Sequence, residues 1–261
     1  MVDGPGVDGD RFGSAAGDYA VHRADFPAVG IDRMVALGVG TPGQRLLDLG
    51  CGTGTLVRQF AARGCAVTGA DVDARMLTAG GVLAESAGLE VFWLECPAED
   101  TGLGSGSFDV VTAAQCWHWF DGDAAAAEVR RVLVPGGLVA VCGFDWLPLP
   151  DTVSGVTEAL IQAHNPSWKL GGIRNPGPAA RVQLVDAGME VLETFTFDVD
   201  VPYAVDSWLR RISVSAGILN LDAGQVAAFD AELAEVMADR FPGDELIAPH
   251  RVWVSVAVSP G

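Results

Sequence analysis

The chain has 261 residues, enough for one large domain or two small ones. Its formal net charge is -18, and Lys169 is its one lysine. A surface this acidic repels phosphate backbones and anionic lipid, which argues against nucleic acid and membranes as partners. Hydrophobic residues make up 49% of the chain, which predicts a substantial buried core.

The cysteines are odd in number and lack metal-ligand spacing, so we expect neither a disulfide framework nor a metal site. They are better explained as small buried hydrophobes in a reducing cytosol. The first residues have neither the basic start nor the apolar stretch of a signal peptide. We therefore expect a cytoplasmic, soluble protein. The five cysteines are Cys51, Cys65, Cys96, Cys116 and Cys142.

From residue 45 onward, short apolar runs alternate with helical patterns, which is typical of βαβ units and a doubly wound α/β sheet. Several runs lack polar alternation, as strands buried on both faces do. Predicted strands cover 45–50, 66–71, 89–95, 107–114, 137–144, 190–201 and 250–259. Predicted helices cover 55–64, 73–88, 123–133, 179–189 and 221–241, with another inside the loop-rich stretch 145–178.

The first strand runs into three glycines at alternate positions, Gly50, Gly52 and Gly54, where a helix begins. A strand, a glycine turn and a helix form the nucleotide site of α/β sheets, but dinucleotide loops read G-x-G-x-x-G, and Thr55 occupies the third glycine position. Asp48 precedes the loop; its carboxylate would repel a phosphate and attract an ammonium group. This favours S-adenosylmethionine (SAM) over NAD.

With that loop, the sequence resembles the class I SAM-dependent methyltransferases, most closely the broad group that contains trans-aconitate and ubiquinone-pathway methyltransferases. The resemblance rests on four motifs in order, and it covers roughly residues 19–144. It implies a Rossmann-like sheet of seven strands, mostly parallel with the last strand antiparallel, and helical lid and cap insertions. The motifs are "LLDLGCGTGTL", "VTGADVDARML", "PAEDTGLGSGSFDVVTAAQCWHWFD" and "EVRRVLVPGGLVAV".

The resemblance also implies a role for each matching residue. Asp48 would hold the ammonium group, and Asp71 the two ribose hydroxyls. Pro97 departs from the family, which often has an acid there for the adenine amino group. The implied cofactor-binding residues are Asp48, Gly50, Gly52, Gly54, Asp71, Val72, Met76, Ala98, Glu99 and Gln115, with Tyr19 and Arg23 from an N-terminal segment.

Each assignment has a simpler alternative. Asp48 and Asp71 would then be ordinary acids at strand ends, and Val72 and Met76 plain core residues. Cys51 is better explained as a small filler than as a nucleophile.

The methyl acceptor should lie beyond the fourth predicted strand, where "HWF" follows. His118 is the residue there with a pKa suited to a general base, although a structural role or packing against the substrate is the favoured explanation. The predicted substrate pocket consists of Trp117, His118, Trp146, Trp168 and Arg211. The loops that carry these aromatic residues would equally suit the interface of a homodimer.

The organisation we expect is a single methyltransferase domain over 1–261, with no metal. It comprises a lid (1–40), a SAM-binding half (41–144), a cap insertion (145–178) and the last helices and strands (179–261). The reaction would be in-line methyl transfer to a small-molecule metabolite or natural-product intermediate, at oxygen before carbon or nitrogen. A SAM-binding protein that does not methylate and an NAD-dependent oxidoreductase remain as alternatives.

Overall fold

The computed structural model describes residues 24–168 and 177–261, which divide into two compact units. Of the described residues, the sheet unit contains 25–144, 177–197 and 252–261, and the helical unit contains 24, 145–168 and 198–251. Tyr19, Arg23 and most of the predicted N-terminal lid lie outside the described residues.

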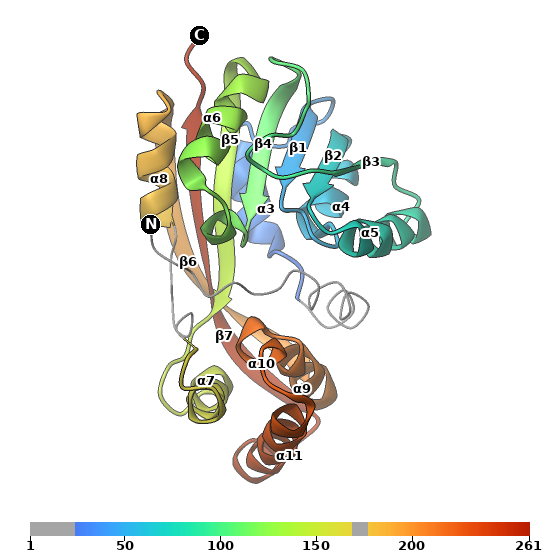
Figure 1. Ribbon diagram of the computed structural model, residues 1–261, viewed down its shortest axis with the longest axis vertical. Helices are drawn as coiled ribbons and strands as arrows, with labels where there is room; N and C mark the ends of the chain where they lie inside the picture. Colours follow the sequence, from blue (N-terminus) through green and yellow to red (C-terminus); the bar gives the residue numbers. More distant parts are fainter. Residues whose placement is uncertain (1–23, 169–176) are drawn as a thin grey trace. The chain divides into compact units, whose positions relative to one another are not determined.

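Seven strands form one sheet in the order β3-β2-β1-β4-β5-β7-β6, which confirms the predicted fold class (Figure 1). The pairs β1–β2, β1–β4, β2–β3 and β4–β5 are all parallel. The strands are β1 (Arg45–Leu49), β2 (Ala66–Asp71), β3 (Val91–Glu95), β4 (Phe108–Ala114), β5 (Leu133–Trp146), β6 (Glu190–Ala204) and β7 (Glu245–Val258).

The last strand runs antiparallel to β5. The Ser259 N–H, just past β7, donates to the Gly137 carbonyl at 2.8 Å, and the Leu147 N–H, just past β5, donates to the Pro249 carbonyl at 2.7 Å. The residue number on β7 thus falls as that on β5 rises, which defines an antiparallel pair.

The helices connect these strands in the alternation that the sequence predicts. Helices α3, α4, α5, α6 and α8 belong to the sheet unit, and α7, α9, α10 and α11 to the helical unit. Their bounds are α3 (Ala28–Ala36), α4 (Thr55–Ala61), α5 (Ala74–Ser86), α6 (Gly122–Val132), α7 (Val153–His164), α8 (Gly177–Asp186), α9 (Val205–Ser213), α10 (Ala216–Leu219) and α11 (Ala223–Arg240), with a 3₁₀ turn, η1, at Trp117–Trp119.

Side-chain caps begin four of these helices; at α7 the Thr152 hydroxyl accepts from the Gly155 N–H. The carboxylates of Asp73, Asp121 and Asp222 accept hydrogen bonds from backbone N–H groups in the first turns of α5, α6 and α11. Gln225 completes a capping box with Asp222. These are local interactions between residues two or three positions apart, which is why the sequence predicts them.

The core of the sheet unit explains how the strand ends are held. Helices α6 and α8 pack against each other, and alternate residues of β1, β4 and β5 join them in one buried cluster. Leu47, Val111 and Val139 belong to that face and are fully buried. This packed core therefore holds the carboxyl ends of β1, β2 and β4 in place.

Three strands differ in extent from the prediction. β5 begins at Leu133 instead of 137, β6 ends at Ala204 instead of 201, and β7 begins at Glu245 instead of 250. The extra residues of β5 pair across the sheet: Leu133 is in register with Phe108 of β4, and the Gly136 N–H donates to the Ser259 carbonyl, just past β7, at 3.2 Å. Such pairing joins residues far apart in sequence, so the local pattern does not predict it.

Candidate active site

The glycine loop lies between β1 and α4, and all three of its glycines have left-handed backbones. The φ angles are 60° at Gly50, 54° at Gly52 and 81° at Gly54. A β-carbon at Gly50 would lie 2.7 Å from Cys116 Cβ, and one at Gly54 would lie 2.5 Å from the Trp93 ring. At Gly52 a β-carbon would meet nothing within 4 Å. Gly50 and Gly54 are therefore needed for packing, whereas Gly52 exposes bare backbone to open space.

Asp48 lies near the end of β1 and is only 2% exposed. Its carboxylate accepts a hydrogen bond from the Thr112 hydroxyl of β4 at 2.6 Å. Burial and, to a smaller extent, the charge of Asp71 raise the pKa of Asp48, and the hydrogen bond from Thr112 lowers it. The net result is a pKa of about 7. Asp48 is thus poised to ionise near neutral pH.

Asp71 ends β2 and ties the glycine loop to the next helix. One carboxylate oxygen accepts the Gly52 N–H at 2.8 Å, and the other accepts the Asp73 N–H at 3.0 Å. Burial raises the pKa of Asp71, and these backbone hydrogen bonds oppose the rise. Because an ionised carboxylate has about four acceptor positions, it can still accept from two hydroxyl groups.

Asp48 and Asp71 together make the loop strongly negative. No cation is among the groups that shift either pKa, and neither side chain forms an ion pair with any residue that the structure describes. Two desolvated carboxylates without a counterion are costly, and a cationic ligand would offset that cost. A pyrophosphate would add to it.

Cys51 lies within the loop and is a poor nucleophile. Burial raises its pKa well above the usual value, and the charges of Asp48 and Asp71 add to the shift. The thiol therefore stays protonated at neutral pH, which favours the filler interpretation.

The residues after β2 provide one exposed and one buried apolar group. Val72 is 67% exposed, whereas Met76, in the first turn of α5, is buried. Across the strand ends, Ala98 is buried, and the Glu99 carboxylate accepts the Asp121 N–H at 2.8 Å. Val72 thus has an open face for a planar group, and Glu99 already supports the start of α6.

Gln115 follows β4 with a φ of 61°, a backbone conformation that side chains other than glycine seldom adopt. Its N–H donates to the Cys142 carbonyl at 2.9 Å, and its side-chain amide donates to the Phe144 carbonyl. These bonds to β5 hold the strained residue in place at the carboxyl end of β4. Strain held in this way is common at functional sites.

The "WHW" turn, η1, divides its aromatic residues between core and surface. Trp117 is 3% exposed, belongs to the core cluster and donates its indole N–H to Gln183 of α8 at 2.8 Å. Trp119 is 45% exposed. Trp117, which the sequence places in the predicted substrate pocket, therefore packs in the core, and Trp119 faces solvent.

His118 lies between them and is exposed, with its ring centroid 4.6 Å from that of Trp119. Partial desolvation by neighbouring groups lowers its pKa to about 4. His118 is neutral at pH 7 and able to accept a proton.

The other predicted pocket residues, Trp146, Trp168 and Arg211, come together inside the helical unit. The two indole N–H groups both donate to the Glu158 carboxylate, at 3.3 Å from Trp146 and 2.9 Å from Trp168. The Arg211 guanidinium lies 5.0 Å from the Trp146 ring centroid. Sequence reasoning missed Glu158, whose signal is a single acid in the apolar helix "VSGVTEALIQAH".

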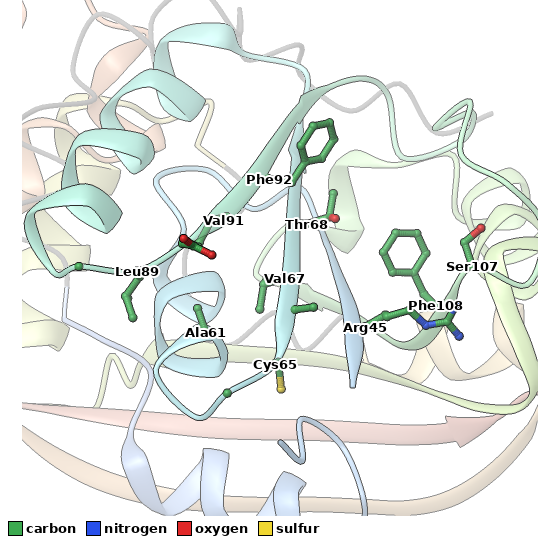
Figure 2. A pocket seen from close by; sticks show the side chains of 14 residues that line it. Arg45, Ala61, Cys65, Val67, Thr68, Leu89, Val91, Phe92, Ser107 and Phe108 are labelled. Atoms are coloured by element: carbon green, nitrogen blue, oxygen red, sulfur yellow. The ribbon is translucent and has the colours of Figure 1, made fainter. Parts of the chain in front are cut away.

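A surface hollow of about 620 Å³ lies at the opposite edge of the sheet unit (Figure 2). It is bordered by the amino ends of the strands, with Arg45 of β1, Val67 of β2 and Phe92 of β3 among its lining residues. Arg45 already pairs with Asp109 at 2.7 Å. The hollow is therefore separate from the glycine loop, which follows the carboxyl end of β1.

No group of three or more His, Cys, Asp and Glu side chains in residues 24–168 and 177–261 could hold a metal ion. Over the same ranges, no helix combines the length and apolar character that crossing a bilayer requires.

Comparison with known proteins agrees with this geometry. The family model "Methyltransferase domain" matches residues 47–141, from β1 into β5. An uncharacterized methyltransferase of Mycobacterium tuberculosis is 38% identical over 147 residues, 56% of each chain. The ubiquinone biosynthesis O-methyltransferase of Cereibacter sphaeroides is 36% identical over 116 residues, 44% of this chain and 47% of that one. The chain thus spans about half the length of these curated relatives.

Among solved structures, one described as a type II methyltransferase from Anaeromyxobacter dehalogenans matches with a TM-score of 0.66 and 23% identity, over 91% of this chain and 97% of that one. At that identity the match shows the fold. The resemblance drawn from the glycine loop and the motifs after it is confirmed: residues 47–141 match the family model of the methyltransferase domain.

Proposed function

We propose that the protein is a SAM-dependent methyltransferase that acts on a small-molecule metabolite or natural-product intermediate. The observation that carries this proposal is the pair of desolvated carboxylates, Asp48 and Asp71, beside the bare backbone of Gly52, with no cation from residues 24–168 or 177–261 to balance them. SAM carries an ammonium and a sulfonium group and no phosphate. NAD would bring a pyrophosphate to the same place.

In this proposal each residue has a defined contact. Asp48 binds the ammonium group, and Asp71 uses its free acceptor positions for the ribose diol. Val72 and Met76 pack against the adenine, beside Ala98 and Glu99. Gly52 lets the backbone approach the cofactor, Gly50 and Gly54 allow the loop to pack closely beneath it, and Gln115 faces the reacting methyl group. Tyr19 and Arg23 remain predictions for closing the site.

When bound, SAM supplies an electrophilic methyl group. The chain's own task is to align the acceptor behind that methyl group and to exclude water. His118, neutral at pH 7, would take the proton of an oxygen acceptor, in keeping with the name of the Cereibacter relative. A His118→Asn variant that lowers kcat and leaves SAM affinity unchanged would support this role; a change in KM alone would assign His118 to packing.

Calorimetry tests the cofactor. The protein should bind SAM and S-adenosylhomocysteine, and not NAD. Asp71→Asn should weaken SAM binding by at least about tenfold, because charge-assisted hydrogen bonds contribute about 1.5–3 kcal/mol each. Glu95→Gln is the matched control, since Glu95 pairs with Asp71 in register on β3 and is exposed. NAD binding without SAM binding would refute the proposal.

Methyl transfer is tested separately by incubating the protein and SAM with metabolite extracts. Mass spectrometry should find a product heavier than its precursor by one CH₂ unit. SAM binding with no such product from any extract would instead favour a SAM-binding protein that does not methylate.

A further inference from the structure

The Trp93 side chain of β3 lies in a space that three glycines leave open, which we call the glycine notch. A β-carbon at Gly54 would lie 2.5 Å from Cη2 of the indole, and one at Gly80 would lie 2.7 Å from the same atom. A β-carbon at Gly69 would lie 3.0 Å from Cζ3. Gly54 immediately precedes α4, Gly69 lies on β2 in register with Trp93, and Gly80 lies within α5. The outer edge of one ring therefore touches the bare backbone of three elements.

Backbone conformation does not explain two of these glycines. Gly54 has a left-handed φ of 81°, whereas Gly69 and Gly80 lie outside the left-handed region. Glycine inside a strand or a helix destabilises it relative to alanine, because the unfolded chain has more freedom to lose. That cost is offset where a neighbouring group needs the space, and here the group is the indole.

The ring also supports the loop between β1 and α4. The Gly54 N–H donates to the Cys51 carbonyl at 2.9 Å, which closes a turn around Gly52. The Gly52 N–H donates to the Asp71 carboxylate at 2.8 Å. Because the indole packs against Gly54, it fixes one end of the turn from which Gly52 presents its backbone.

Helix α5 contacts the loop at the same place. The β-carbon that Gly80 lacks would lie 3.0 Å from the Thr53 carbonyl oxygen, so loop and helix touch beside the ring. Met76 lies one turn before Gly80 on α5, and Asp71 lies two residues after Gly69 on β2. Because a packed interior transmits changes in volume to its neighbours, a smaller or displaced ring would move all three elements that carry the proposed cofactor contacts.

We propose that Trp93 is a positioning residue of the cofactor site. Its indole sets the distance of the glycine loop from β2 and α5, and so the direction in which Gly52 presents its backbone beside Asp71. That these groups hold SAM rests on the proposed function. The position of the loop does not, because every contact in the glycine notch is made by the chain itself.

Three single variants test the role of the ring. Trp93→Phe leaves the glycine notch partly empty, and Gly80→Ala adds a methyl group where the ring lies. Gly81→Ala is the matched control, because its β-carbon would lie 3.7 Å from Trp93 Nε1, an ordinary van der Waals contact. All three are measured at a temperature at which urea unfolding shows each variant to be folded.

Two measurements are made on each variant. In the ligand-free protein, amide hydrogen exchange by NMR at Gly52 and Gly54 should become faster by about tenfold or more in Trp93→Phe and Gly80→Ala. Calorimetry should show that the same two variants bind S-adenosylhomocysteine about fivefold or more weakly. Gly81→Ala should match the wild type in both measurements. A purely structural role for Trp93 would lower the urea midpoint and leave the affinity of the folded protein unchanged.

The double variant, Trp93→Phe with Gly80→Ala, tests the contact directly, because the added methyl group fills space that the smaller ring vacates. It should bind S-adenosylhomocysteine more tightly than either single variant, which is strong non-additivity. Losses of affinity that multiply as if independent would overturn the inference, and so would exchange at Gly52 and Gly54 that is unchanged in both single variants. Should Trp93→Phe fail to fold, Gly80→Ala compared with Gly81→Ala decides.

Failure of this inference and failure of the proposed function give different results. If S-adenosylhomocysteine binds the wild type, Trp93→Phe and Gly80→Ala alike, Trp93 does not position the site and the proposed function stands. If S-adenosylhomocysteine does not bind the wild type, the proposed function fails, and amide exchange alone decides whether Trp93 positions the loop.

Discussion

At the scale of single residues, buried charge governs this protein. Asp48 and Asp71 gain little from their surroundings except hydrogen bonds from Thr112 and from backbone N–H groups. A stable fold tolerates two such carboxylates when a ligand later neutralises them. Their raised pKa values make ligand binding depend on pH in a way that can be measured.

Asp48 should release a proton when the cofactor binds. Its pKa is about 7 in the free protein, and an ammonium group beside it would lower that value. At about pH 6, calorimetry in buffers of different ionisation enthalpy should therefore show close to one proton released per S-adenosylhomocysteine. Affinity should rise as pH increases through 7, by up to about tenfold per unit below that value.

The Asp48→Asn variant isolates this group, because the amide oxygen can still accept from Thr112 but cannot titrate. It should bind more weakly and release fewer protons. If heats in the wild type did not depend on the buffer, Asp48 would not contact the ammonium group.

Gly52 offers a second test at this scale, because its backbone is left-handed and unobstructed. Gly52→Ala should destabilise the fold by about 1 kcal/mol, because the left-handed backbone strains any residue with a β-carbon. It should also reduce the affinity for S-adenosylhomocysteine by about tenfold or more, because the added methyl group would occupy the open space beside the loop. Gly43→Ala is the control: Gly43 has φ 87° and nothing within 4 Å of a β-carbon, but lies before β1. Equal affinity in the two variants, measured beside urea unfolding, would contradict the contact.

At the scale of elements, two carboxylates join helix α6 to the loop that follows β3, Glu99 at the start of the helix and Glu128 within it. Glu128 accepts from the Thr101 N–H at 2.9 Å, from the Thr101 hydroxyl at 2.5 Å, and from two nitrogens of Arg131 at 2.6 and 2.7 Å. These bonds lower the pKa of Glu128 to about 2, with Arg131 the largest cause. The start of β4 follows that loop, so Glu128 helps to position the strand that ends at Gln115.

Glu128→Gln should destabilise the protein by about 2–3 kcal/mol at pH 7, since charge-assisted bonds are lost and buried donors lose their acceptor. The folded-state pKa lies below the unfolded value of 4.5, so this stability is present above pH 4.5 and is lost as pH falls towards 2. Urea unfolding at pH 7 and pH 3.5 should show a smaller difference between variant and wild type at the lower pH.

The control is Asp109→Asn at the exposed pair with Arg45, which should cost less than about 1 kcal/mol. If the two substitutions had equal effects, burial of Glu128 would not be what strengthens its bonds.

At the scale of the whole molecule, self-repulsion opposes the fold. The chain carries 34 acidic residues against 16 Lys and Arg, and its sequence pI is about 4.3. Like charges crowded on a compact surface destabilise it relative to the unfolded chain. The large apolar core, with Trp208, Phe60 and Phe229 fully buried, opposes this repulsion.

Salt should therefore stabilise the protein at pH 7. Raising NaCl from about 10 mM to about 150 mM shortens the screening length from about 30 Å to about 8 Å, and the thermal midpoint should rise by several degrees. The control is the same pair of salt concentrations near the pI, where the rise should vanish. A midpoint that fell with salt at pH 7 would mean that attractive ion pairs dominate instead.

The sequence by itself determined the features that depend on near neighbours. The alternate glycines require left-handed turns, and Asp73, Asp121 and Asp222 cap helices through contacts two or three residues away. Strand–helix alternation then leads to a doubly wound sheet, and Asp48 and Asp71 follow at strand ends because the carboxyl ends of parallel strands share one edge.

Only the tertiary structure decided what each side chain meets across the chain. Trp117 packs in the core because Gln183, 66 residues away, accepts its indole N–H. The Glu158 carboxylate accepts the indole N–H groups of both Trp146 and Trp168, and the Arg211 guanidinium lies over the Trp146 ring. No local pattern encodes these contacts, because each depends on how separate helices pack.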